Sequence, residues 1–504
     1  MTSPVRALAV AALLAAAGLA FFACGERGDG PGKAPPAPAA TDTGATARAA
    51  FAAFFRPNPD RIPHELATNP GTPWGDYVGS TSCKPCHEKA YAGWRDSFHS
   101  RTLYDVVPGT VFGDFSGRAG TYDDPRYNLS VRPFTKDGRY FMEIRERRVG
   151  ARKSDWLPVV EEGTFEVVYA FGNRRHQPYV ARAADGRYVV LPVFWDDVQH
   201  AFDWDGWRPY VQGCAHCHVT GIKSTDERTG NGLPLTPTRP QRYSPPSTAE
   251  GWSEGAIGCE VCHGPGRAHV EKATAMGDAG YRAYLREGGA STIYDPSKDT
   301  RERRMQQCDT CHNFFSESQV TWVPGPGGYP HDPYTHPLTP ADDPKQFHEN
   351  GTDLSPCTVG RVFRASKMGR AAIECRDCHS VHGNSNWAEL TESIDDNRLC
   401  LKCHELDKSG AFKDKAAVAR HAHHDPAGPG VLCVECHMPR DKHFSNGVVI
   451  MAAELHSHAM SIPTGYENER GGPASACNSC HRDRDALWTR KTLEAWHRGE
   501  PGPR

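Results

Sequence analysis

One short motif, Cys-x-x-Cys-His, occurs eight times in the 504 residues and constrains this chain more than any other feature. The motifs use 16 of the 18 cysteines and leave Cys24 and Cys357. Two thiols at this spacing form thioethers with the vinyl groups of haem, and the adjacent histidine reaches the iron as proximal ligand. The sequence therefore predicts eight covalently attached haem c groups. The motifs are CKPCH (Cys83, Cys86, His87), CAHCH (Cys214, Cys217, His218), CEVCH (Cys259, Cys262, His263), CDTCH (Cys308, Cys311, His312), CRDCH (Cys375, Cys378, His379), CLKCH (Cys400, Cys403, His404), CVECH (Cys433, Cys436, His437) and CNSCH (Cys477, Cys480, His481).

Two other uses of paired cysteines fit less well. Zinc knuckles and thioredoxin-like redox pairs also contain Cys-x-x-Cys, but neither requires a histidine after every second cysteine. Composition agrees with haem. The apolar fraction is 38%, with 49 glycines and 40 prolines, which is low for a conventional core in a chain of this length. We expect the macrocycles to fill much of the interior.

The N-terminus has the pattern of an export signal. Arg6 precedes an apolar run from Ala7 to Ala23, so residues 1–23 are predicted to be a signal peptide. Cys24 then resembles the lipidated cysteine of a bacterial lipoprotein, the alternative being an ordinary signal peptide cut near Ala23. Residues 24–55 are predicted to be this anchor and a disordered linker. The mature protein is expected in the periplasm or at the outer membrane or cell surface.

The spacing of the motifs predicts the architecture. From Cys214 onward one motif follows another every ~38 residues, which leaves room for a helix or two and a loop. We therefore expect a mostly α fold with long loops around closely packed haems. β-rich segments around an Asp137-Gly138 turn predict a small insertion near residues 122–197. The expected parts are a first haem-binding segment (75–121), a β-rich insertion (122–205) and a seven-haem domain (206–490).

Second axial ligands must come from the 17 histidines outside the motifs (25 − 8). His382 lies three residues after His379 and His269 six after His263, so neither can reach the far face of the haem on its own motif. Each is expected to ligate a neighbouring haem. The other predicted ligands are His99, His176 and His458, and His421 or His424 is expected to supply another. His331, His336, His348 and His443 compete for the remaining sites, and Met368, Met438 and Met460 are alternatives.

Several runs resemble a known superfamily. GCAHCHVTG, GWSEGAIGCEVCHGPGRAHV and SKMGRAAIECRDCHSVHG resemble multihaem cytochromes related to hydroxylamine oxidoreductase and pentahaem nitrite reductase, over about residues 75 to 490. YVGSTSCKPCH followed by WRDSFHS is similar to the related tetrahaem electron-shuttle cytochromes. The resemblance implies parallel and perpendicular haem pairs in a mostly helical fold. All eight motifs here end in His, whereas the nitrite reductases use one Lys, and no tyrosine stands out as a haem cross-link.

Two functions follow from these observations. The first is electron transfer along mostly bis-His haems, with redox proteins or extracellular or quinol-linked donors and acceptors as partners. The second is an oxidoreductase of a small nitrogen or sulfur compound, in which one five-coordinate haem binds substrate. The net charge of −3 gives no indication of nucleic-acid binding. Oligomers and filaments stay open, and Cys24 is the expected contact with a membrane.

Overall fold

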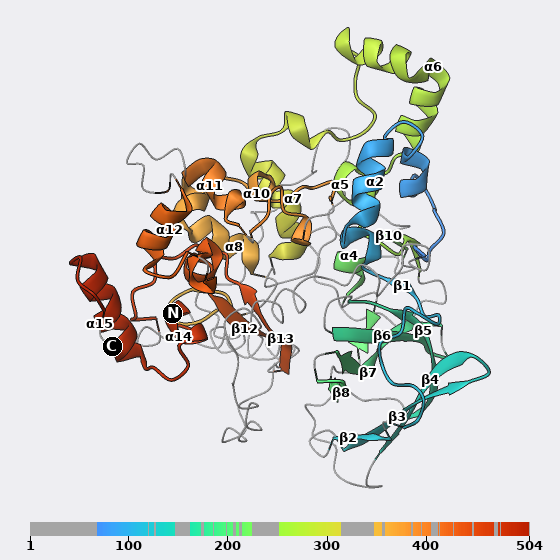
Figure 1. The fold of residues 1–504 in the computed structure, drawn as a ribbon. Helices are drawn as coiled ribbons and strands as arrows, with labels where there is room; N and C mark the ends of the chain where they lie inside the picture. The colour runs from blue at the N-terminus through green and yellow to red at the C-terminus, as the bar shows by residue number, and fades with distance from the viewer. Residues whose placement is uncertain are drawn as a thin grey trace, which may run out of the picture.

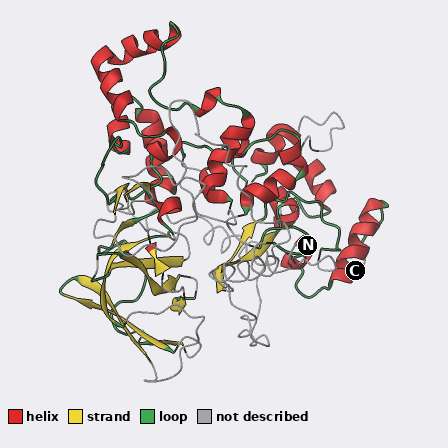
Figure 2. Ribbon diagram, turned by 180° about the vertical axis from the view of Figure 1, so that it is seen from behind, coloured by secondary structure: helices red, strands yellow, loops and turns green. Residues whose placement is uncertain are grey.

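The computed structural model describes residues 68–502 with gaps, the longest being 147–161, 224–250 and 314–346. The predicted signal peptide, Cys24 and the linker lie outside the described residues. Two kinds of structure are present. Short helices surround the Cys-x-x-Cys-His motifs, and an antiparallel sheet lies beneath one end of them (Figures 1 and 2). Within the described residues, no helix is both long and apolar enough to cross a membrane.

Within the part of the chain that the structure describes, the large sheet has nine strands in the order β2-β3-β4-β5-β6-β7-β8, with β1 added to β5 and β9 to β7. Between β3 and β4, Asp137 and Gly138 both have positive φ (50° and 72°). This is the two-residue turn whose twist matches that of the paired strands. The strands are β1 (Tyr104–Asp105), β2 (Tyr122–Asp124), β3 (Leu129–Lys136), β4 (Arg139–Glu146), β5 (Gly163–Ala170), β6 (His176–Arg182), β7 (Tyr188–Asp196), β8 (Ala201–Trp204) and β9 (Arg208–Pro209).

Strand β7 carries two cores, one on each side. Leu191 and Val193 belong to a core of residues from the sheet itself, together with Val131 and Ile144. Val190 faces the other way, into a second core that includes Tyr210, Trp252 and the first two residues of the second motif, Cys214 and Ala215. The continuous apolar run of β7 is typical of a strand buried on both faces. This strand therefore docks the sheet against the second motif.

The helices of the motif region follow the order of the chain across the molecule. Figure 1 shows α2 and α5 at one end, α7 and α10 in the middle, and α12, α14 and α15 at the other end. The helices are α2 (Glu88–Asp96), α4 (Ala215–His218), α5 (Cys259–His263), α6 (Arg267–Arg286), α7 (Arg301–His312), α8 (Val359–Ala365), α9 (Lys367–Arg370), α10 (Cys375–Cys378), α11 (Arg398–His404), α12 (Lys415–Ala422), α13 (Cys433–His437), α14 (Ala476–Cys480) and α15 (Ala486–His497). Short 3-10 turns are η1 (Ser80–Cys83), η2 (His99–Arg101), η3 (Pro296–Lys298), η5 (Trp387–Glu389) and η6 (Pro429–Val431).

The prediction of a mostly α fold is wrong, because sheet is a major part of the described structure and curls into a nearly closed antiparallel barrel. The sheet begins at β1 and ends at β9, so it is larger than the small insertion expected near 122–197. Two further antiparallel strand pairs lie next to motifs. They are β10 (Thr220–Lys223) with β11 (Gly251–Glu254), and β12 (Arg440–Ser445) with β13 (Val448–His456). Two-residue strands such as β1 and β9 are held by backbone pairing and leave no alternating pattern in the sequence.

Candidate haem attachment sites

Each motif forms about one helical turn. His379 donates its backbone N–H to the Cys375 carbonyl at 2.9 Å, and His481 donates to Cys477 at 2.8 Å. Positions i, i+3 and i+4 lie on one face of such a turn. Both cysteines and the histidine of a motif are therefore presented to the same side, as attachment and ligation of a single haem require.

Backbone carbonyls orient four of the motif histidines. In each case the ring Nδ1 lies 3.0–3.1 Å from a carbonyl oxygen. Because a carbonyl can only accept, Nδ1 carries the proton and Nε2 keeps the lone pair that binds a metal. The four contacts are His218 with Thr102, His263 with Tyr294, His379 with Ala388 and His437 with Ser461.

Six motif histidines each face a second histidine at nearly the same distance. Two imidazoles that bind one iron from opposite sides, each through a nitrogen ~2.0 Å from the metal, have ring centroids ~6.3 Å apart. The six pairs have centroid separations of 6.2–6.4 Å, so they fit an iron atom between the rings. The pairs are His87–His269, His312–His99, His263–His382, His379–His458, His437–His421 and His481–His424.

One of these pairs differs from the rest in orientation. The His99 and His312 rings are 82° apart. In the other five pairs the interplanar angle lies between 10° and 39°. The orientation of axial ligands affects the electronic structure of a haem iron, so this site is expected to have its own spectroscopic signature.

Desolvation by the surrounding protein keeps two of these imidazoles neutral. Desolvation, with a smaller contribution from His99, lowers the pKa of His312 to about 4. Desolvation also lowers the pKa of His458 to about 3. A neutral imidazole is the form that ligates a metal, so both side chains are ready to bind at neutral pH.

The second histidine of a pair often comes from a different motif segment. His382 follows α10 but lies beside His263 of α5, and His269 of α6 lies beside His87. The structure thus brings both next to a neighbouring motif's histidine. The segment at the end of α12 supplies two sites, with His421 beside His437 and His424 beside His481. One short segment therefore supplies the second histidine at both of the last two motifs.

The other predicted ligands lie at other positions or fall outside the described residues. His176 lies in β6, with its ring 4.4 Å from that of Phe194 and Nε2 3.4 Å from a carboxylate oxygen of Asp196. His404 ends α11 at the surface. His331, His336 and the side chain of His443 lie outside the described residues. The second ligands of His218 and His404 therefore stay unassigned.

Two buried carboxylates near the first and third motifs were not singled out from the sequence. Glu260, 1% exposed, accepts hydrogen bonds from the backbone N–H groups of Val78, Gly79 and Gly266. Glu254 accepts from the backbone N–H and hydroxyl of Ser80. Burial raises the pKa of both carboxyls. Glu260 is part of CEVCH, and nothing in that pattern distinguishes an inward-facing Glu from a surface one.

Comparison with known proteins agrees with the motif chemistry. Residues 369–409 match the family model described as "Doubled CXXCH motif". The structure is similar to the crystal structure of outer cell wall cytochrome OcwA, with 17% identity and a TM-score of 0.52, covering 84% of this chain and 88% of that one. An undecahaem cytochrome from the S-layer of Carboxydothermus ferrireducens matches with 17% identity and a TM-score of 0.37, covering 90% of this chain and 64% of that one. No curated protein matches.

The doubled motif supports a multihaem c-type cytochrome with haem c as its cofactor, and the similarity to OcwA concerns the fold. The model of the doubled motif covers the fifth and sixth motifs, including Cys375, Cys378, Cys400 and Cys403. The comparisons do not show the expected relationship to hydroxylamine oxidoreductase and pentahaem nitrite reductase.

Proposed function

We propose that this chain is an exported octahaem c-type cytochrome that carries electrons along a series of mostly bis-His haems at the bacterial envelope. The observation that carries the proposal is the set of six histidine pairs at 6.2–6.4 Å. They recur from the first motif to the eighth. Haem c bound at these positions supplies one-electron oxidation and reduction.

The protein residues have three roles in this proposal. The sixteen motif cysteines (8 × 2) hold the macrocycles covalently, so the carriers cannot dissociate. The motif histidines and their partners would hold the iron from both sides. The carbonyls that accept from Nδ1 fix the ring orientation, which limits the rearrangement accompanying each redox change. The candidates for the ligands that His218 and His404 still lack in this assignment are His331, His336, His348 and His443.

A second histidine opposite the motif histidine would favour electron transfer over catalysis on a small substrate. Activation of a nitrogen or sulfur compound needs an open coordination position with proton donors nearby. At six sites a second imidazole stands where such a substrate would bind. These pairs support electron transfer as the main function.

The proposed location is outside the cytoplasm. The N-terminal run before Cys24 has the pattern of an export signal. The similar OcwA is named an outer cell wall cytochrome. We infer redox proteins, quinol-linked donors and extracellular acceptors as partners, with the lipid at Cys24 as the membrane contact. The relationship to hydroxylamine oxidoreductase and pentahaem nitrite reductase stays a prediction.

The test uses the purified holoprotein from a host that attaches haem c. Mass spectrometry is expected to show eight haems, and the ferric protein is expected to give low-spin signals at the six paired sites. Nitrite and hydroxylamine should leave its spectrum unchanged. A high-spin signal that shifts with either compound would favour the oxidoreductase. A colourless protein that binds zinc would overturn the cofactor assignment itself.

A further inference from the structure

The fourth motif, CDTCH at residues 308–312, contacts three other motifs through α7. We propose that it is a junction at which three arms of the haem chain meet, through the second, third and fifth motifs. This inference rests on the proposed function and deepens it. A carrier in the middle of a linear chain has two neighbours, whereas a junction has three.

The second motif meets the fourth through a pair of cysteines and a shared support. The Cys217 and Cys311 side chains are neighbours, and α4 packs against α7. His99 of η2 faces His312, while Thr102, three residues later, holds the second motif. The Thr102 carbonyl accepts from His218 Nδ1 at 3.1 Å, and its hydroxyl donates to the His218 carbonyl at 2.7 Å. One short segment thus fixes both sites.

The third motif also contacts α7. Gln307, which directly precedes the fourth motif, donates its side-chain N–H to the Cys262 carbonyl at 2.5 Å. Cys262 also lies within electrostatic range of Cys308 and Cys311. Beyond it the arm continues to the first motif, because the Cys83 and Cys259 side chains are neighbours and the Cys259 N–H donates to the Ser80 hydroxyl.

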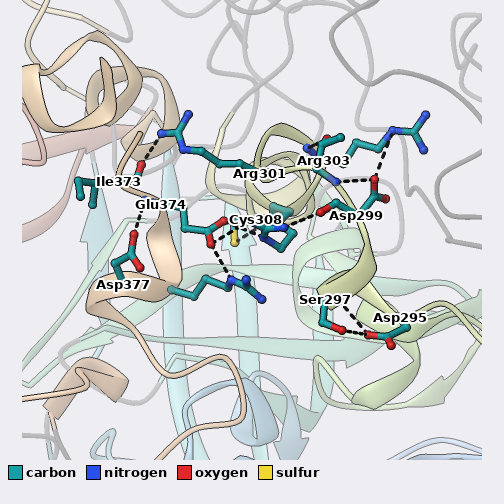
Figure 3. A network of polar contacts seen from close by, with 12 residues as sticks. Asp295, Ser297, Asp299, Arg301, Arg303, Cys308, Ile373, Glu374 and Asp377 are labelled. Carbon is teal, nitrogen blue, oxygen red and sulfur yellow. Dashed lines mark hydrogen bonds and ion pairs between the residues drawn. The ribbon is translucent and has the colours of Figure 1, made fainter. Parts of the chain in front are cut away.

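The fifth motif forms the third contact. The Cys308 and Cys375 side chains are neighbours. Arg304 of α7 pairs with Glu374, the residue before Cys375, at 2.9 Å. Figure 3 shows Cys308 in this network together with Glu374 and Asp377. These contacts join α7 and α10 into one unit.

The third arm continues from the fifth motif through the sixth, seventh and eighth motifs. Lys402 of the sixth motif donates to the Asp377 carbonyl and to the Thr391 hydroxyl. Asn397, just before α11, accepts from the Cys433 N–H at 2.8 Å and so joins the sixth and seventh motifs. α13 packs against α14, which joins the seventh and eighth. The three arms therefore lead to the first motif, to the eighth motif, and to the second motif beside the sheet.

The perpendicular ligand planes at His99 and His312 provide the means of testing this. The ferric signal of this site should differ from those of the five pairs whose rings lie 10–39° apart. Its electron spin relaxation is accelerated by each paramagnetic neighbour. We would compare the ferric wild type with two variants that each lack one haem, C214A/C217A at the second motif and C477A/C480A at the eighth as the matched control.

Loss of the second-motif haem should slow the relaxation of the fourth-site signal, and loss of the eighth should leave it unchanged. Equal relaxation in both variants, each shown by mass to carry seven haems, would overturn the junction. If C214A/C217A does not accumulate, His218→Met raises the potential of that haem, so mild reduction makes it diamagnetic first, and His481→Met is the control. The same two outcomes then apply.

Failure of the junction and failure of the proposed function give different results. A protein with eight attached haems but no effect of the second motif on the fourth site would refute only the junction. A protein with fewer haems, or with high-spin iron at the paired sites, would refute the proposed function.

Discussion

The sheet and the motif region differ in what fills their interiors. In the sheet, Val131, Met142, Ile144 and Leu191 are fully buried against one another. In the motif region the helices that consist of a motif are only four or five residues long. Their histidine rings stand ~6.3 Å apart, the distance expected across an iron atom.

This difference separates stability that is intrinsic to the polypeptide from stability that depends on the cofactor. Apolar side chains stabilise the sheet by ~25 cal/mol per Å² of buried surface, with or without haem. Isolated helices shorter than ~12 residues are marginal in water. Helices such as α5, α10 and α13 therefore need covalently attached haems to hold them together. The predictions below test this contrast.

The largest effect should follow from preventing haem attachment. In a haem-free chain we expect the amides of α10 to α14 to exchange with solvent quickly, because their packing partners are missing. The strands β3 to β7 should keep most of their protection. Hydrogen exchange read by mass spectrometry would measure both regions in one sample. Equal protection of α10 to α14 with and without haem would contradict the comparison.

A core substitution in the sheet should have a large effect confined to the sheet. Ile144→Ala removes a fully buried side chain and is expected to cost ~2–5 kcal/mol, with Ile144→Val costing only ~0.5–1.5 kcal/mol. The local unfolding free energy of β3 and β4 by hydrogen exchange is the measurement. The haem spectrum should stay as in the wild type. A loss of haem ligation in Ile144→Ala would show that the two regions are not independent.

The same contrast explains how much of the molecule could be predicted from sequence. The motif spacing predicts the attachment residues, and because His269 and His382 cannot reach the haem on their own motifs, the sequence also predicts a neighbouring site for each. The apolar run of β7 and the Asp-Gly turn predicted strands. The partnership of His99 with His312 was not predictable, because it depends on how η2 docks beside α4 and α5. The buried Glu260 left no signal for the same reason.

Substitution of one closely packed glycine should perturb a single haem site, with a smaller effect than the two changes above. A Cβ at Gly93 of α2 would lie 2.7 Å from the His382 carbonyl oxygen and 2.9 Å from that of Gly383. Since these are backbone atoms, Gly93→Ala should push His382 away from His263. Part of that site should become high-spin in the ferric protein, measured by electron paramagnetic resonance.

Gly280→Ala in α6 is the control, because its Cβ would meet only Met276, at 3.5 Å. This variant should keep every paired site low-spin, and the helix should gain up to ~1 kcal/mol in propensity. A wild-type spectrum for Gly93→Ala would contradict this prediction. It would mean that His382 keeps its position beside His263 although its loop is displaced.

The smallest effects should come from ion pairs, and here too the two regions should differ. Arg304 pairs with Glu374 between the fourth and fifth motifs, with side-chain exposures of 17% and 10%. Arg132 pairs with Glu143 on the sheet and is 50% exposed. Exposed pairs are weak and screened by salt. Arg132→Ala should therefore leave the unfolding midpoint and the haem spectrum unchanged.

Arg304→Ala should instead shift the reduction potentials of the haems at the fourth and fifth motifs, because it leaves Glu374 beside Cys375 with Arg376 as its remaining arginine partner. A more negative surrounding favours the ferric state, so the expected shift is downward. Spectroelectrochemical titration of both arginine variants measures it. A shift of equal size in Arg132→Ala would mean that net charge alone causes it, whereas a shift confined to Arg304→Ala would locate that pair in the connection between α7 and α10.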